Sequence, residues 1–91
     1  MILISYDIKD DKLRTKFAKF ITKFGHRMQY SVFEITHSSN MLGKIKDQIN
    51  EIFGHLFCEN DSVIIIETSK TCEITYFGRE KHNDEDVIIS V

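Results

Sequence analysis

The stretch MILISYDIKDDKLRTKFAKFITKFG, residues 1–25, decides the fold of this chain. It opens with a nearly continuous apolar run over 2–7, which predicts a short strand with apolar contacts on both faces. Over 13–24 the apolar side chains recur at helical spacing instead, which predicts an amphipathic helix directly after the strand. Gly25 follows the helix and predicts a left-handed stop. The apolar stripe of this helix is Leu13, Phe17, Phe20, Ile21 and Phe24.

The rest of the chain predicts further strands and a second helix. In RMQYSVFEIT, residues 27–36, the apolar alternation changes parity near Val32. That change predicts a bulge, a bend or a hairpin, in one bent strand or two short strands. A helix over 40–53 can be capped by Asn40 or Ser39. Its apolar stripe is Leu42, Ile45, Ile49, Ile52 and Phe53. The remaining predicted strands span 61–68, 72–78 and 87–91.

This order of elements is the ferredoxin-like plan of an α+β protein, βαββαβ with a C-terminal strand extension, in a single domain over 1–91. Two helices cover only one face of a sheet, yet the strands over 2–7 and 61–68 carry apolar residues on both sides. A homodimer in which the bare sheet faces pack together across a two-fold axis satisfies both faces. Tyr30 and Phe33 are expected in the core or at that dimer interface.

Composition and charge exclude several classes of protein. At 91 residues, with 42% apolar and 29% charged residues, the chain is an ordinary globular domain with no apolar run long enough to span a bilayer. The apolar start lacks a basic leader, and Cys58 and Cys72 form no CxxC pair, so we expect a cytoplasmic protein with reduced thiols. Residues 1–27 hold seven basic and three acidic side chains, whereas 28–91 hold five and eleven. A domain polarised in this way can present a basic face although its net charge is −2.

Lysines form a second stripe on the predicted first helix, beside the apolar one. At intervals of four, three and four residues, they are Lys12, Lys16, Lys19 and Lys23. Arg14 lies on the other flank of the apolar stripe. A stripe of this kind is either a solvated helix face or a surface for the phosphates of a nucleic acid, and the residues alone leave both interpretations open.

Asp7, a charged residue, is the last residue of the first predicted strand. One interpretation is that its carboxylate accepts backbone amides or caps the next helix; the other is that it is an oxygen ligand of Mg²⁺. A single Asp supplies only one protein ligand for a metal ion, but two copies near a two-fold axis would give two carboxylates facing one ion. Such an ion could polarise a phosphate and activate water for phosphodiester cleavage. Asp10 and Asp11 are better explained as helix-start residues, either of which can cap the helix.

Two segments resemble a known family. YDIKDDKLR, residues 6–14, is similar to the family's start, in which an apolar strand runs into Tyr-Asp and is followed by Asp and basic residues. GHRMQYSVFE, residues 25–34, resembles its second signature, Gly-x-Arg-apolar-Gln-x-Ser-Val-Phe-Glu. The family is the small CRISPR-associated protein of the spacer-acquisition module, the partner of the CRISPR integrase. The resemblance extends over residues 2–68.

The resemblance implies a ferredoxin-like homodimer whose C-terminal tail and strand, 79–91, cross onto the partner subunit. It also implies that Asp7 is the catalytic metal ligand of a Mg²⁺-dependent endonuclease for RNA or double-stranded DNA. In the integration complex of that family, the dimer lies between two integrase dimers and holds the duplex part of the prespacer DNA, and its nuclease activity is dispensable there. The expected partners are a second copy, the CRISPR integrase, duplex DNA and single-stranded RNA. The expected phosphate-binding residues are Lys12, Arg14, Lys16, Lys19 and Arg27. The expected interface residues of the exchanged strand are Val87, Ile88 and Ile89.

An alternative outside this family is a ferredoxin-like dimer that binds a small regulatory ligand and has no nuclease activity. It rests on fold analogy alone. A ligand-dependent rise in melting temperature, without affinity for nucleic acid, would favour it.

Overall fold

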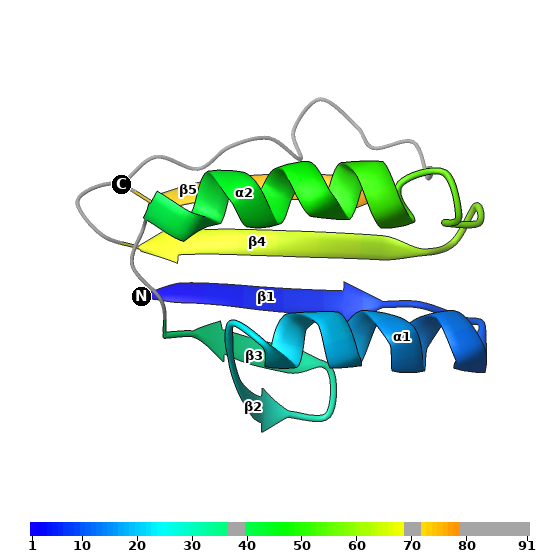
Figure 1. The fold of residues 1–91 in the computed structure, drawn as a ribbon, viewed down its shortest axis with the longest axis horizontal. Helices are drawn as coiled ribbons and strands as arrows, with labels where there is room; N and C mark the ends of the chain where they lie inside the picture. Colours follow the sequence, from blue (N-terminus) through cyan, green and yellow to red (C-terminus); the bar gives the residue numbers. More distant parts are fainter. Residues whose placement is uncertain (37–39, 69–71, 79–91) are drawn as a thin grey trace.

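The structure of the chain is a computed structural model that describes residues 1–36, 40–68 and 72–78 (Figure 1). Strands and helices follow one another in the predicted order. They are β1 (Ile2–Asp7), α1 (Asp11–Thr22), β2 (Gly25–Gln29), β3 (Val32–Ile35), α2 (Asn40–Gln48), the π-helical turn η1 (Ile49–Phe53), β4 (Ser62–Thr68) and β5 (Cys72–Gly78). The predicted strand over 87–91 lies outside the described residues. Of the helices described, none combines the length and the apolar character that a bilayer crossing requires.

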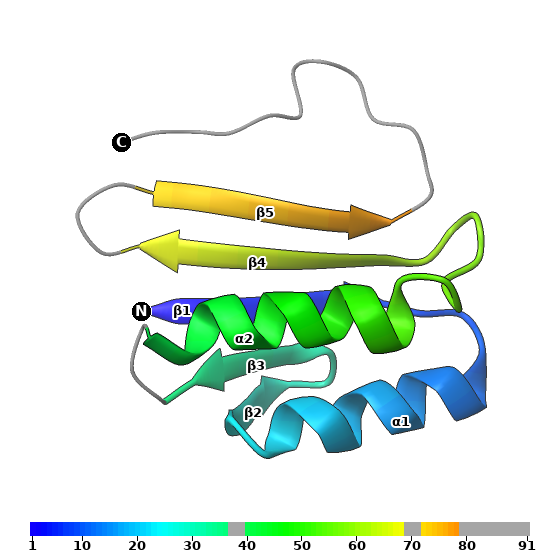
Figure 2. The ribbon, with the colours of Figure 1, turned by 45° about the horizontal axis from the view of Figure 1, so that its top comes forward.

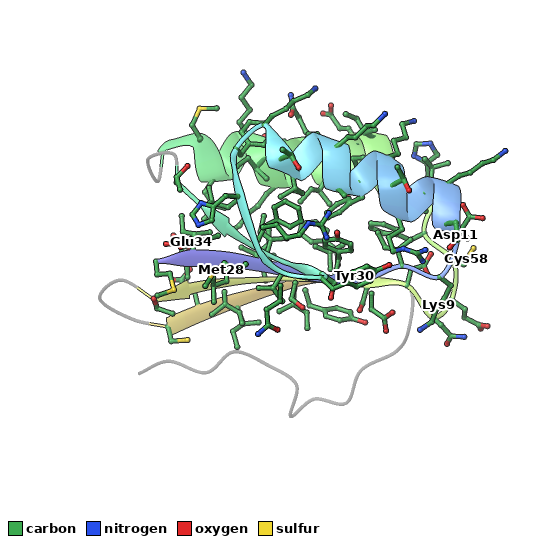
Figure 3. The ribbon with its side chains drawn as sticks, turned by 90° about the horizontal axis from the view of Figure 1, so that it is seen from below. Lys9, Asp11, Met28, Tyr30, Glu34 and Cys58 are labelled. Carbon is green, nitrogen blue, oxygen red and sulfur yellow. The ribbon has the colours of Figure 1, made fainter. Side chains whose placement is uncertain are left out.

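The described strands form one antiparallel sheet in the order β2-β3-β1-β4-β5. The first strand therefore lies at the centre, because α1 and α2 each carry the chain across the sheet to a new position (Figure 2). Seen edge-on in Figure 3, the sheet has both helices on the same side. This confirms the ferredoxin-like α+β fold, with β5 as an added edge strand.

The core lies between the sheet and the two helices. In β1, Ile4 and Tyr6 point toward the helices and are 0% and 4% exposed. Phe17 of α1 is the centre of an aromatic cluster, with its ring centroid 5.1 Å from that of Tyr6 and 5.0 Å from that of Phe53. Contacts of this kind fix α1 and η1 over β1, so the end of β1 and the start of α1 are held in place by the core.

Asp10 caps α1, as the sequence predicts. Its Oδ2 accepts the N–H of Leu13 at 2.8 Å, and Asp11 is the first residue of the helix. The cap satisfies one of the free amides at the helix start, and both carboxylates lie where the helix dipole favours negative charge.

The prediction of a left-handed stop at Gly25 is wrong. Gly25 is the first residue of β2, and none of the described glycines has a positive φ. The helix ends at Lys23 in a right-handed conformation. What requires glycine at position 25 is space, because a Cβ there would lie 2.0 Å from the carbonyl oxygen of Glu34 on β3.

This close approach gives a stability prediction with a matched control. Gly25→Ala would force a Cβ against the paired strand, and we expect a loss of roughly 1–3 kcal/mol in the free energy of unfolding. Gly43→Ala on α2 introduces the same methyl group where nothing lies within 4 Å. There we expect a gain of about 0.5–1 kcal/mol from helix propensity. Urea unfolding of the two variants measures both, and equal effects would contradict the packing explanation.

Residues 27–36 form parts of two strands in a hairpin, which settles the alternative between one bent strand and two short ones. The turn directly precedes Val32, and the register between β2 and β3 also shifts between Arg27 and Gln29, so a bulge at Met28 lies opposite Val32 and Phe33. With the bulge there, Arg27 pairs with Phe33.

The second predicted helix is an α-helix that continues into a π-helical turn. In η1 the N–H of Gly54 donates to the carbonyl of Ile49 at 2.9 Å, which is the wider spacing of a π-helix. Ile49 and Phe53 are buried, whereas Ile52 is 40% exposed. The prediction that Ile52 belongs to the buried stripe is therefore wrong, because it assumed an even α-helical spacing to the end of the segment.

Apolar side chains also line the side of the sheet that carries no helix. Strand alternation places them opposite the core residues, and each is half-buried in the single chain. They are Leu3, Val32, Ile64, Ile66, Ile74 and Tyr76. This face fits the predicted dimer interface, and the homodimer itself stays a prediction.

Candidate nucleic-acid interface and metal ligand

Three of the predicted phosphate-binding lysines lie together on α1. Lys12, Lys16 and Lys19 are all exposed, since intervals of four and three residues put them on one side of the helix. With Asp11 and Thr15 they line a shallow surface hollow of about 390 Å³. Long basic side chains around an open hollow suit an extended phosphate backbone.

Arg14 is held against the loop between β1 and α1. Its Nη1 donates to the carbonyl of Ile8 at 3.0 Å and to that of Lys9 at 3.4 Å. Its Nη2 donates to Oδ1 of Asp11. The hydrogen bond to Asp11 raises the pKa of Arg14 above its usual value. Loss of hydration lowers this pKa, whereas the nearby Tyr30 raises it further. Arg14 is therefore a permanent cation that also has a structural role, with 27% of its side chain exposed.

Arg27 reaches the same region from β2. Its guanidinium lies over the ring of Phe33, 4.9 Å from the centroid, and its Nη1 donates to the carbonyl of Tyr30. These contacts orient the side chain before any ligand binds. A second hollow of about 250 Å³ lies here, lined by Tyr6, Arg14, Thr15, Ala18, Arg27 and Tyr30.

The two hollows share Thr15, so they are neighbours on the surface. We call them together the basic surface; it runs from the exposed side of α1 to the turn between β2 and β3. The sequence predicted the three lysines as part of a stripe on one helix, and the fold brings Arg14 and Arg27 beside them. The five basic members are Lys12, Arg14, Lys16, Lys19 and Arg27.

Asp7 is the last residue of β1 and lies on the side of the sheet without helices, by alternation from the buried Tyr6. Its side chain is 65% exposed. Both carboxylate oxygens lie near the ammonium of Lys9, with Nζ 3.0 Å from Oδ1 and 3.2 Å from Oδ2. Asp7 is therefore not the helix cap, which is Asp10, and its partner is a neighbouring lysine.

The donor type at Asp7 suits Mg²⁺, because that ion prefers carboxylate oxygen and keeps several waters. The number of donors in one chain is small. Among the residues that the structure describes, no group of three or more His, Cys, Asp or Glu side chains could hold a metal ion. A site for magnesium at Asp7 therefore needs a second carboxylate from another molecule, as the two-fold arrangement predicts, or phosphate oxygens of a substrate.

Asp61 is a residue that sequence reasoning missed. It is 0% exposed, and its carboxylate accepts two backbone amides, that of Lys9 at 2.9 Å and that of Cys58 at 2.8 Å. It thereby ties the loop after β1 to the loop before β4. In the sequence it is only an acidic residue at the start of the strand predicted over 61–68, which does not show that it is buried.

The residues predicted at the dimer interface lie in different parts of the structure. Tyr30 is 72% exposed in the turn between β2 and β3, where Figure 3 labels it. Phe33 is 1% exposed and packs in the core of its own chain, so the first of its two predicted places is confirmed and its place at a dimer interface is not. It pairs with Ile4 of β1, which is 0% exposed, so both side chains lie on the side of the sheet that the helices cover. Val87, Ile88 and Ile89 lie outside the described residues.

The fold and the site together define a small ferredoxin-like α+β protein with a basic surface on its first helix and an exposed carboxylate at the end of its central strand. The chain belongs to the family described as CRISPR associated protein Cas2, whose family model matches residues 1–75. The resemblance seen in the sequence is thus confirmed over most of the described chain.

Relatives with curated names are similar over different lengths. A CRISPR-associated endoribonuclease Cas2 of Thermus thermophilus is 30% identical over 94 residues, covering 96% of this chain and 95% of that protein. CRISPR-associated endoribonuclease Cas2 3 of Synechocystis sp. is 38% identical over 53 residues, 58% of each chain. Against that protein and a Rhodospirillum rubrum relative, the chain spans little more than half of their lengths, 58% and 55%. No solved structure gives a significant match.

Proposed function

We propose that this chain is the duplex-DNA-binding subunit of a CRISPR spacer-acquisition complex. The observation that carries the proposal is the basic surface, in which five cations from α1 and β2 lie around two adjoining hollows. Lysine and arginine contacts to phosphates bind a duplex without reading its sequence. Contacts of that kind suit a protein that must accept arbitrary DNA fragments.

The proposed working form is a homodimer that bridges integrase dimers. The half-buried apolar side of the sheet supports it, because the described part of the chain places no second layer over that face. Two copies would present two basic surfaces to one duplex. Membership of the Cas2 family supports the CRISPR integrase as the protein partner.

Charge reversal on α1 tests the proposal. We expect Lys16→Glu with Lys19→Glu to weaken binding of a labelled duplex roughly tenfold or more at low salt. The slope of log affinity against log salt should become shallower by about 2, because two phosphate contacts are lost. The measurement is fluorescence anisotropy in EDTA over a series of salt concentrations.

The matched control is Lys44→Glu with Lys46→Glu, which makes the same change in net charge on α2. Its affinity should stay within about twofold of the unchanged protein, since α2 lies outside the basic surface. Equal losses in both double variants, or binding that ignores salt, would contradict a specific role for α1.

As a second candidate we propose metal-dependent phosphodiester cleavage at Asp7. The exposed strand-end carboxylate supports it, and so does the word endoribonuclease in the names of the relatives. Asp7 residues from two copies would hold a Mg²⁺ ion, which would supply charge stabilisation and an activated water. RNA and double-stranded DNA are both candidate substrates. Of this chain's own residues, the basic surface would hold the nucleic acid and Asp7 would fix the ion.

A further inference from the structure

The loop between β1 and α1 is fastened from two sides. The N–H of Lys9 donates to the buried carboxylate of Asp61 at 2.9 Å. From the other side, Nη1 of Arg14 donates to the carbonyls of Ile8 and Lys9 at 3.0 and 3.4 Å. The backbone of Lys9 is thus held by the distant Asp61 and by the nearby Arg14, and this fixes where its side chain begins, next to Asp7.

The ammonium nitrogen of Lys9 lies 3.0 and 3.2 Å from the two carboxylate oxygens of Asp7. The ion pair as a whole carries no net charge, so it attracts a second cation less strongly than an unpaired carboxylate would. A divalent ion that binds Asp7 competes with the ammonium for the carboxylate oxygens, and this competition lowers the apparent affinity of the ion. Both side chains are well exposed, 60% for Lys9 and 65% for Asp7, so the competition is moderate rather than absolute.

We propose that Lys9 is a built-in counter-ion that competes with a hard divalent cation, Mg²⁺ or Mn²⁺, for Asp7. The inference rests on the second candidate function, in which Asp7 is a metal ligand. Lys9 thereby sets the concentration of divalent cation at which Asp7 binds an ion. It also allows two Asp7 carboxylates to approach across a two-fold axis without a metal, because two unpaired carboxylates would repel each other.

Direct binding of Mn²⁺, followed by the loss of the free-ion signal in electron paramagnetic resonance, tests this without any cleavage assay. We expect Lys9→Gln to bind Mn²⁺ about three- to fivefold more tightly than the unchanged protein at low salt. Lys9→Arg, which keeps the positive charge beside Asp7, should behave like the unchanged protein. Lys44→Gln is the control for net charge, since it removes one positive charge on α2, and it should leave Mn²⁺ affinity unchanged.

Two further variants assign the effect to Asp7. Asp7→Asn should remove the Mn²⁺ site, and it should also abolish the gain when combined with Lys9→Gln. Equal Mn²⁺ affinity in Lys9→Gln and the unchanged protein would overturn the proposal, as would a gain that persists without Asp7 or a lack of binding in both proteins. Melting curves check that each variant is folded. Duplex binding in EDTA does not depend on a metal ion at Asp7. If the unchanged protein failed to bind duplex in EDTA, that result would contradict the DNA-binding proposal and leave the proposal for Lys9 standing.

Discussion

Asp7→Asn is expected to reduce metal-dependent cleavage of labelled RNA or duplex DNA by roughly a hundredfold or more, to the level seen with a chelator. The amide is close in size to the carboxylate but carries no negative charge, so it holds a divalent ion poorly. The fold should survive, because Asp7 is 65% exposed and loses only a surface ion pair with Lys9. Such a pair contributes about 1 kcal/mol at most.

Asp47→Asn is the matched control, because it removes an exposed carboxylate on α2 and should cleave like the unchanged protein. Each protein is assayed with Mg²⁺ and with EDTA, and duplex binding is measured in EDTA beside it. Equal cleavage by Asp7→Asn and the unchanged protein would remove Asp7 from the reaction. Absence of cleavage by the unchanged protein would withdraw the second candidate function and leave a binding subunit whose chemistry belongs to its partner.

The elements of the fold were predictable because their signals are local. Helical spacing of apolar residues marked α1, and runs of β-branched residues marked β4 and β5, whose observed bounds are Ser62–Thr68 and Cys72–Gly78. The order of these elements was enough to predict the sheet and the side on which the helices lie. The three lysines of the candidate site were also predictable, because a lysine stripe is visible in a single helix.

What the sequence did not show depends on contacts between distant residues. The role of Gly25 is set by the carbonyl of Glu34 on the neighbouring strand, which a helix-end rule does not consider. Phe33 was expected either in the core or at a dimer interface, and its pairing with the buried Ile4 of β1 places it in the core. Asp61 contacts Lys9 across 52 positions of the chain, so no local pattern could pair them.

That long-range contact leads to the largest expected change in stability. We expect Asp61→Ala to lower the free energy of unfolding by about 3–5 kcal/mol, because two backbone amides lose their charged acceptor. The carboxylate is 0% exposed, so water does not simply take its place at the N–H groups of Lys9 and Cys58. For a domain of this size, the melting temperature should fall by roughly 15–30 °C.

Two controls separate the hydrogen bonds of Asp61 from its volume and charge. Asp61→Asn keeps one acceptor oxygen but turns an NH₂ group toward the other amide, so we expect it to be destabilised by about half as much. Glu59→Ala removes an exposed carboxylate from the same loop and should change stability by less than about 0.5 kcal/mol. If Asp61→Ala melted within a few degrees of Glu59→Ala, the buried carboxylate would not be what fastens the loop after β1. The position of Lys9 beside Asp7 would then have to come from Arg14, the other group that binds this loop.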